Sequence, residues 1–169
     1  MTLAARAGGD GVLTCLAMRN LVLSFSVLAA LAACSKSSPQ LSTADARDVL
    51  IDRNWIDRMP ETTTDRLHVY RFVPTMGGGV YQDRTLFKGT FELFLFKVEH
   101  DDHIVFSLPE THEKVTSAFT IEKVSGPGPF DLKLTIASDP RGPREYYSIR
   151  AETDRDGHLL EQRLSAAPH

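Results

Sequence analysis

Apolar and polar residues alternate along several short stretches of this chain, and that period of two most constrains its fold. In residues 130–136, single polar or charged residues separate Phe130, Leu132, Leu134 and Ile136. Side chains of a β-strand point alternately to opposite faces, so this stretch predicts a strand with one buried and one solvated face. The same alternation recurs in residues 68–72, 104–108 and 115–121.

Turn-forming segments separate these stretches. They are rich in Gly, Pro, Asp and Thr, which interrupt regular structure, and they lie at residues 74–79, 100–102, 109–111, 125–129 and 139–143. Strands that follow one another at roughly 8–15 residues with no helix between them pair as antiparallel neighbours. We therefore expect an all-β fold: an antiparallel meander of about seven to eight strands that closes into a sandwich or barrel.

Residues 90–98 (TFELFLFKV) depart from simple alternation, because apolar residues occupy both parities. A strand of this composition is typically covered on both faces or kinked. Before the strands, Ser42 is a suitable helix N-cap, and Asp45 lies where a helix N-terminus favours negative charge. We expect a short helix of about three turns that ends near Asn54.

A stretch within the first 34 residues has the layout of a secretory signal peptide. Arg19 supplies a positive charge, residues 21–31 (LVLSFSVLAAL) form an uncharged apolar run, and small residues precede Cys34. The run is too short to span a membrane, which takes about 20 residues. The tetrad Leu-Ala-Ala-Cys resembles the lipobox of bacterial lipoproteins. The resemblance implies cleavage after Ala33 and acyl chains on Cys34.

This resemblance sets the expected organisation of the chain. We expect translation to begin at Met18 with residues 1–17 not belonging to the protein, a signal peptide at 18–33, a lipidated tether at 34–43 and a single β domain at 44–169. Two or more acyl chains anchor a protein stably to a membrane. Ser35 follows the cysteine where Asp would retain a lipoprotein at the inner membrane, so the expected location is the periplasmic face of the outer membrane.

The positions of the two cysteines and the net charge limit the expected covalent links and partners of the mature domain. Cys15 lies before the expected cleavage point and Cys34 would carry lipid, so no disulfide is expected in the mature domain. Residues 34–169 carry 17 basic and 21 acidic side chains, a net charge of −4. An acidic chain without a basic stripe argues against a nucleic-acid partner.

A second resemblance concerns the body of the chain. A short helix, Trp55 at the start of the first strand, a meander of strands and a late Arg together resemble a small bacterial lipocalin-like barrel. The resemblance implies that Trp55 packs at the closed end of the barrel beneath Arg150, a cation–π contact. The family's Gly two residues before the Trp is Arg53 in this chain.

The interior of such a barrel has two possible uses. Barrels of about eight strands can enclose a small ligand or fill their interior with side chains, and the aromatic residues, including Phe91, Phe94, Phe96 and Phe130, suit either. If a ligand is bound, the inward positions expected to contact it are Tyr70, Phe72, Phe106, Phe119, Ile121, Leu132 and Leu134.

The loop of residues 139–144 (DPRGPR) is the most distinctive connection between strands. Two prolines stiffen it, and Arg141 and Arg144 carry guanidinium groups that suit bidentate contacts with carboxylates or phosphates. One interpretation is a rim contact for an anionic headgroup. The other is a rigid connection with solvated arginines, which we favour.

Other motifs predict no catalytic, metal or cofactor site. His100-Asp101-Asp102-His103 has the composition of a metal site but lies at an expected turn. Residues 152–157 resemble the start of a calcium loop, yet its twelfth position is Arg163 where Glu is needed. Residues 77–79 are glycine-rich without the Lys-Ser/Thr of a phosphate loop.

Three functions remain open from the sequence. The first is an outer-membrane lipoprotein that binds an apolar or amphipathic small molecule in its barrel. The second is a non-catalytic envelope interaction or structural lipoprotein with a solid core and an unidentified protein partner. The third, an enzyme, is disfavoured and would need His100 or His103 to converge with Asp101 or Asp102 in a cleft.

Overall fold

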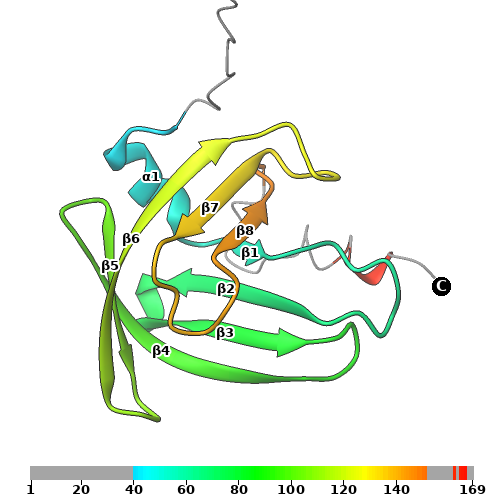
Figure 1. Cartoon of the computed structure of the whole chain (residues 1–169), viewed down its shortest axis with the longest axis horizontal. Helices are drawn as coiled ribbons and strands as arrows, with labels where there is room; N and C mark the ends of the chain where they lie inside the picture. Colours follow the sequence, from blue (N-terminus) through cyan, green and yellow to red (C-terminus); the bar gives the residue numbers. More distant parts are fainter. Residues whose placement is uncertain (1–39, 152–161, 163, 167–169) are drawn as a thin grey trace, which may run out of the picture. The chain divides into compact units, whose positions relative to one another are not determined.

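Eight antiparallel strands, each paired with the next along the chain, form a closed barrel (Figure 1). The structure is a computed structural model that describes residues 40–151, 162 and 164–166. The predicted all-β meander closing into a barrel is confirmed. The elements are α1 (Thr43–Leu50), β1 (Asn54–Ile56), β2 (Leu67–Val73), η1 (Pro74–Met76), β3 (Gly78–Arg84), β4 (Gly89–Glu99), β5 (His103–Leu108), β6 (Glu113–Lys123), β7 (Leu132–Ile136) and β8 (Glu145–Ser148).

The barrel closes where β1 meets β8. These two short strands share one pair of facing residues, Ile56 and Tyr147. A side-chain hydrogen bond reinforces the contact, because the Ser148 hydroxyl donates to the Asn54 carbonyl at 2.8 Å. The Arg53 guanidinium also donates to the Ile149 carbonyl at 3.3 Å.

Helix α1 has the predicted start but ends earlier than predicted. The Ser42 hydroxyl accepts a hydrogen bond from the Asp45 amide at 3.2 Å, as expected of an N-cap. The helix ends at Leu50 and not near Asn54, since Ile51 already pairs with Phe72 of β2 and Asp52 adopts a positive φ of 54°. Within the residues described, no helix is long and apolar enough to cross a membrane.

Aromatic rings fill the barrel interior. Tyr70 lies at the centre, with its ring centroid 4.8–6.0 Å from those of five neighbours. Those neighbours are Phe72, Tyr81, Phe94, Phe106 and Tyr146, all almost fully buried. Apolar side chains on the outside of β1 and β2 form a smaller second cluster with Phe130, Ile149 and Leu164.

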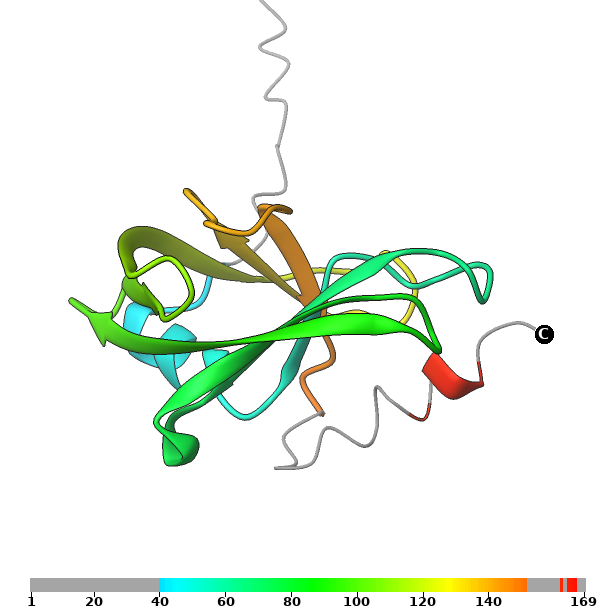
Figure 2. The ribbon, with the colours of Figure 1, turned by 90° about the horizontal axis from the view of Figure 1, so that it is seen from below.

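Strand β4 buries one face only. Phe94 and Phe96 point into the barrel, whereas Phe91, Leu93 and Leu95 are 54–70% exposed on its outer face. Of the two expectations for this strand, coverage on both faces is therefore wrong, because the outer apolar row is uncovered within the described part of the chain. The strand changes its partner along its length, from β3 over residues 89–94 to β5 over residues 95–99. Figure 2 shows β3 and β4 running across the face of the barrel nearest the viewer.

Candidate functional site

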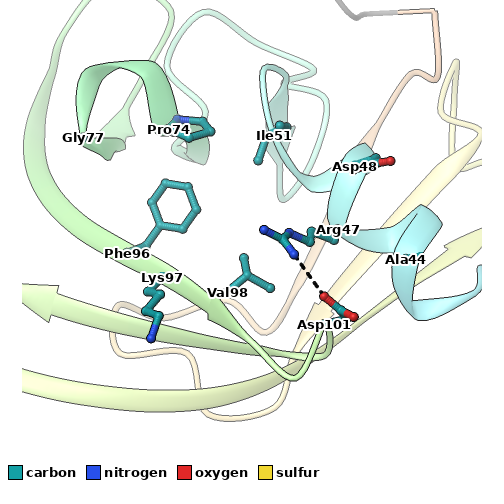
Figure 3. A pocket seen from close by; sticks show the side chains of 10 residues that line it. All are labelled: Ala44, Arg47, Asp48, Ile51, Pro74, Gly77, Phe96, Lys97, Val98 and Asp101. Carbon is teal, nitrogen blue, oxygen red and sulfur yellow. Dashed lines mark hydrogen bonds and ion pairs between the residues drawn. The ribbon is translucent and has the colours of Figure 1, made fainter.

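A cavity of about 520 Å³ lies between α1, η1 and β4 (Figure 3). Its apolar wall combines Phe96 and Val98 of β4, which both belong to the inward-facing parity of that strand, with Ile51 and Pro74. Phe96, Val98 and Ile51 pack against the main core, and the Phe96 ring lies 5.1 Å from that of Phe72. The cavity therefore lies beside the aromatic interior, within the usual size range of small-molecule sites, about 300–1,000 Å³.

Charged side chains surround this cavity. Arg47 projects into it from α1 and pairs with Asp101 of the β4–β5 turn, with 3.2 Å between Nη1 and Oδ1 (Figure 3). Asp48 also lines it, whereas the Lys97 side chain points away from it and pairs with Glu99 at 3.0 Å (Figure 3). The Arg47 and Asp101 side chains are both about half exposed, so solvent screens their attraction and a competing anion can reach the guanidinium.

The residues predicted to contact an internal ligand all lie in the main core of the barrel. All seven are at most 3% exposed and belong to the main core cluster: Tyr70, Phe72, Phe106, Phe119, Ile121, Leu132 and Leu134. None of them lines the cavity beside α1. Two further aromatic candidates lie outside the interior, because Phe91 is exposed and Phe130 belongs to the second cluster.

A buried polar cluster centres on Asp139 in the loop between β7 and β8. The Tyr70 hydroxyl donates to Oδ1 of Asp139 at 2.8 Å, and the Tyr146 hydroxyl donates to Oδ2 at 2.5 Å. The backbone amide of Arg141 donates to Oδ1 at 2.9 Å. Burial raises the pKa of both tyrosines far above the ordinary value, and the Asp139 charge raises it further. Both hydroxyls therefore remain protonated donors.

Arg141 folds back onto the barrel. Its side chain is 8% exposed, its Nε lies 2.7 Å from a carboxylate oxygen of Glu92, and its guanidinium covers the rings of Tyr81 and Phe94 at 5.5 and 5.4 Å. Arg144 is exposed. Arg141 is therefore not the solvated residue that the rigid-connection interpretation expects, and its guanidinium contacts a carboxylate of its own chain.

The cation over Trp55 is a different residue from the one predicted. The Arg53 guanidinium lies 5.9 Å from the Trp55 ring centroid, and both residues are buried. Arg150 is exposed, and its backbone amide donates to Asp131. Among the described residues, the cation recorded over the Trp55 ring is thus Arg53, two residues earlier in the sequence, and no contact between Trp55 and Arg150 is recorded.

The His100–His103 segment forms the predicted turn. His100 and Asp101 have positive φ angles of 52° and 61° at the β4–β5 connection. Asp101 pairs with Arg47, and Asp102 contacts the His103 ring at 2.6 Å. Among residues 40–151, 162 and 164–166, no group of three His, Cys, Asp or Glu side chains could hold a metal ion.

Several predicted features lie outside the described residues. These are the cleavage site at Ala33, the lipidation site at Cys34 and the calcium-like loop at residues 152–157. The cavity residues were not predicted, since Arg47 and Ile51 on one side and Phe96 and Val98 on the other are far apart in sequence. The inward parity of Phe96 and Val98 was the only available signal.

Comparison of the chain with protein-family models, curated proteins and solved structures found no match. The site therefore has to be interpreted from its own geometry.

Proposed function

We propose that this chain is a lipid-anchored envelope protein that binds a small amphipathic anion in the cavity beside α1. The observation that carries the proposal is the pairing of an apolar wall with the Arg47 guanidinium at one cavity. Ile51, Phe96 and Val98 would contact the apolar part of the ligand, and Arg47 would contact its acidic group. A fatty acid is the simplest molecule with this chemistry.

Anchoring through Cys34 is proposed from the lipobox-like tetrad. Labelled palmitate should enter the full chain, and the Cys34→Ser chain should leave the membrane fraction. Lack of label, with Cys34→Ser still membrane-bound, would contradict anchoring and leave the cavity proposal standing. Fractionation of the two membranes tests the outer-membrane location that Ser35 favours.

Ligand binding is tested by titrating the full chain with a fluorescent fatty acid. Arg47→Gln should weaken binding by about tenfold, since a charge-assisted contact contributes about 1.5 kcal/mol. Asp101→Asn should strengthen binding, because it releases Arg47 from its ion pair. Arg144→Gln removes an exposed Arg elsewhere and should change nothing.

Opposite responses of the Arg47 and Asp101 variants are the signature of an anion at this cavity. Saturable uptake that neither variant alters would place the ligand elsewhere. Absence of saturable uptake would contradict the binding function.

A second function is supported by the filled interior and by the uncovered outer face of β4. A barrel whose interior is packed with aromatic side chains and whose outer face bears exposed Phe91, Leu93 and Leu95 suits an interaction or structural lipoprotein. Cross-linking in intact cells should then capture a defined neighbour, and Cys34→Ser should abolish that capture.

A further inference from the structure

Five large apolar side chains lie exposed along one continuous segment of the barrel. They are Met76 of η1, Phe87 of the β3–β4 turn and Phe91, Leu93 and Leu95 of β4, with exposed fractions of 54–80%. We name them the β3–β4 patch. At roughly 200 Å² for a large side chain, they expose about 700 Å² of mainly apolar surface. Patches on monomeric proteins rarely exceed about 300–600 Å², so this one indicates a binding surface.

The occupant of this patch must contact side chains. Strand β4 pairs with β3 over residues 89–94 and with β5 over residues 95–99, and the exposed Phe91, Leu93 and Leu95 lie on its outer face. A partner therefore packs face to face on the outer surface of β3 and β4.

We propose that the β3–β4 patch binds a second copy of this chain about a twofold axis level with Leu93. Twofold interfaces are self-complementary, so each patch residue must meet another patch residue of the second copy. If the two β4 strands stack in opposite directions with Leu93 at the centre, Leu93 meets its own counterpart. Phe91, two residues before the centre, then meets Leu95, two residues after it.

The two remaining patch residues satisfy the same symmetry. Val80 of β3 is the register partner of Leu93, so it lies level with the proposed axis. Met76 precedes Val80 by four residues, and Phe87 lies beyond the opposite end of β3. Reversing the strand direction brings Met76 of one copy close to Phe87 of the other. One operation thus covers all five exposed side chains.

A hollow in the patch also fits a second copy. A depression of about 150 Å³ lies beside Leu95 and is lined by Met76, Val80, Leu93 and the side-chain-free Gly78. The proposed symmetry places Phe91 of the other copy, which is 70% exposed, over this hollow. Two such insertions, one from each copy, would give the interface the interlocking packing of a specific contact.

The area agrees with a dimer of ordinary size. A standard interface buries about 800 Å² per partner. The five patch residues expose about 700 Å² at the same roughly 200 Å² per side chain, and Val80 and Pro109 border them. A membrane surface is the competing occupant, since Lys88 and Lys97 lie exposed at the ends of the β4 row.

Cysteine pairs test the symmetry directly in cells that produce the full chain. Leu93→Cys alone should yield a cross-linked dimer with a short bis-maleimide, because a residue at the axis faces itself. Phe91→Cys and Leu95→Cys should each cross-link at least about fivefold less alone, yet should join each other when co-produced. The unsubstituted chain gives the background from Cys15 and Cys34, and Thr116→Cys, exposed on β6, reports random collision.

A second experiment places a charge at the proposed twofold axis. Leu93→Glu should abolish cross-linking between Met76→Cys and Phe87→Cys chains, whereas Thr116→Glu should not. Both substitutions lie on exposed positions, and unchanged circular dichroism confirms folding. If Leu93→Cys gives no more cross-linked dimer than the unsubstituted chain or Thr116→Cys, the proposal is overturned. If the Leu93→Cys thiol is instead shielded from polar maleimides until detergent is added, a lipid surface is the occupant and the dimer is excluded.

Discussion

At the scale of single residues, Asp139 shows how one carboxylate orders the centre of the barrel. It accepts hydrogen bonds from Tyr70 and Tyr146, whose rings contact each other at 5.1 Å, and from the backbone of Arg141. Buried polar groups are costly unless paired, so these groups depend on one another. The loop between β7 and β8 is thereby fixed to the aromatic core.

We expect strong coupling between these groups in a double-mutant cycle. Tyr146→Phe should lower the free energy of unfolding by about 1.5–3 kcal/mol, since it removes a hydrogen bond to a charged acceptor. Asp139→Ala should cost more, because it leaves two buried hydroxyls without this acceptor. Urea denaturation of both single variants and the double variant measures the coupling. Additive losses would contradict a shared network.

The Asp65 carboxylate makes the free energy of unfolding depend on pH. Its carboxylate accepts a hydrogen bond from the Thr62 hydroxyl and others from the amides of Thr62 and Glu61, which hold its pKa below the ordinary 3.8. A pKa lower in the folded than in the unfolded state stabilises the fold above about pH 5, and this contribution is lost as pH falls through the folded pKa.

The matching measurement compares the chain with its Asp65→Asn variant. The difference in unfolding free energy should stay constant from pH 7 to about pH 5 and shrink below about pH 4, where both side chains are neutral. A difference that grows on acidification would have the opposite sign and would contradict this assignment.

The limits of sequence-based prediction are clearest at single residues. Alternation correctly placed Tyr70 and Phe72 in the core, because strand parity is a local property. The Arg53 guanidinium over the Trp55 ring was not predicted, since no local pattern shows which guanidinium reaches that ring. Likewise, no local pattern reveals that Arg141 turns inward toward Glu92.

At the scale of elements, β3 lies so close to its two neighbouring strands that glycine is required at its start. A Cβ on Gly78 would lie 2.3 Å from the Phe94 carbonyl oxygen of β4. One on Gly79 would lie 2.4 Å from Cζ of the Phe94 ring and 2.6 Å from the Arg71 carbonyl oxygen of β2. The two carbonyl oxygens belong to the backbone and cannot move aside as a flexible side-chain end could. The glycine-rich segment that resembled a phosphate loop is therefore explained by close backbone packing.

Glycine is required at Gly78 by close contacts and at Gly77 by backbone conformation, and substitutions at the two positions separate these causes. Gly78→Ala should destabilise the barrel by about 1–3 kcal/mol through overpacking. Gly77 has open space but a positive φ of 75°, so Gly77→Ala should cost about 1–2 kcal/mol. Gly77→Asn should recover most of the Gly77 loss because Asn tolerates that conformation, whereas Gly78→Asn should be no better than Gly78→Ala. Thermal melting with known enthalpies measures all four variants.

The positions of the helix and strands were predicted better than the solvent exposure of their faces. Turn residues and alternation located most of the strands, and Ser42 located the start of α1. The sequence of β4, however, contains no sign that its outer face stays uncovered. Coverage depends on which distant segments pack over a strand, and no local period records that.

At the scale of the whole molecule, the junction of β1 and β8 is the weakest part of the barrel. It has one pair of facing residues, whereas β2 and β3 share seven. Ser148 and Arg53 add hydrogen bonds across the junction through side chains. Local opening should therefore begin here, because few bonds have to break.

Hydrogen exchange tests this expectation. Ser148→Ala should lower global stability by only about 1 kcal/mol while accelerating exchange of β1 and β8 amides more than those of β3 and β4. Thr135→Ala, on neighbouring β7, serves as the control. If amide exchange accelerates equally in all strands, the barrel opens only by complete unfolding.

The tightly filled interior has a mechanical consequence. Hydrostatic pressure unfolds proteins chiefly by eliminating their internal voids, and the rings around Tyr70, with centroids 4.8–6.0 Å apart, fill the centre of the barrel. The volume decrease on unfolding should consequently fall at the small end of the usual range, about 20 mL/mol. A barrel of this kind would resist compression far better than a hollow one of equal size.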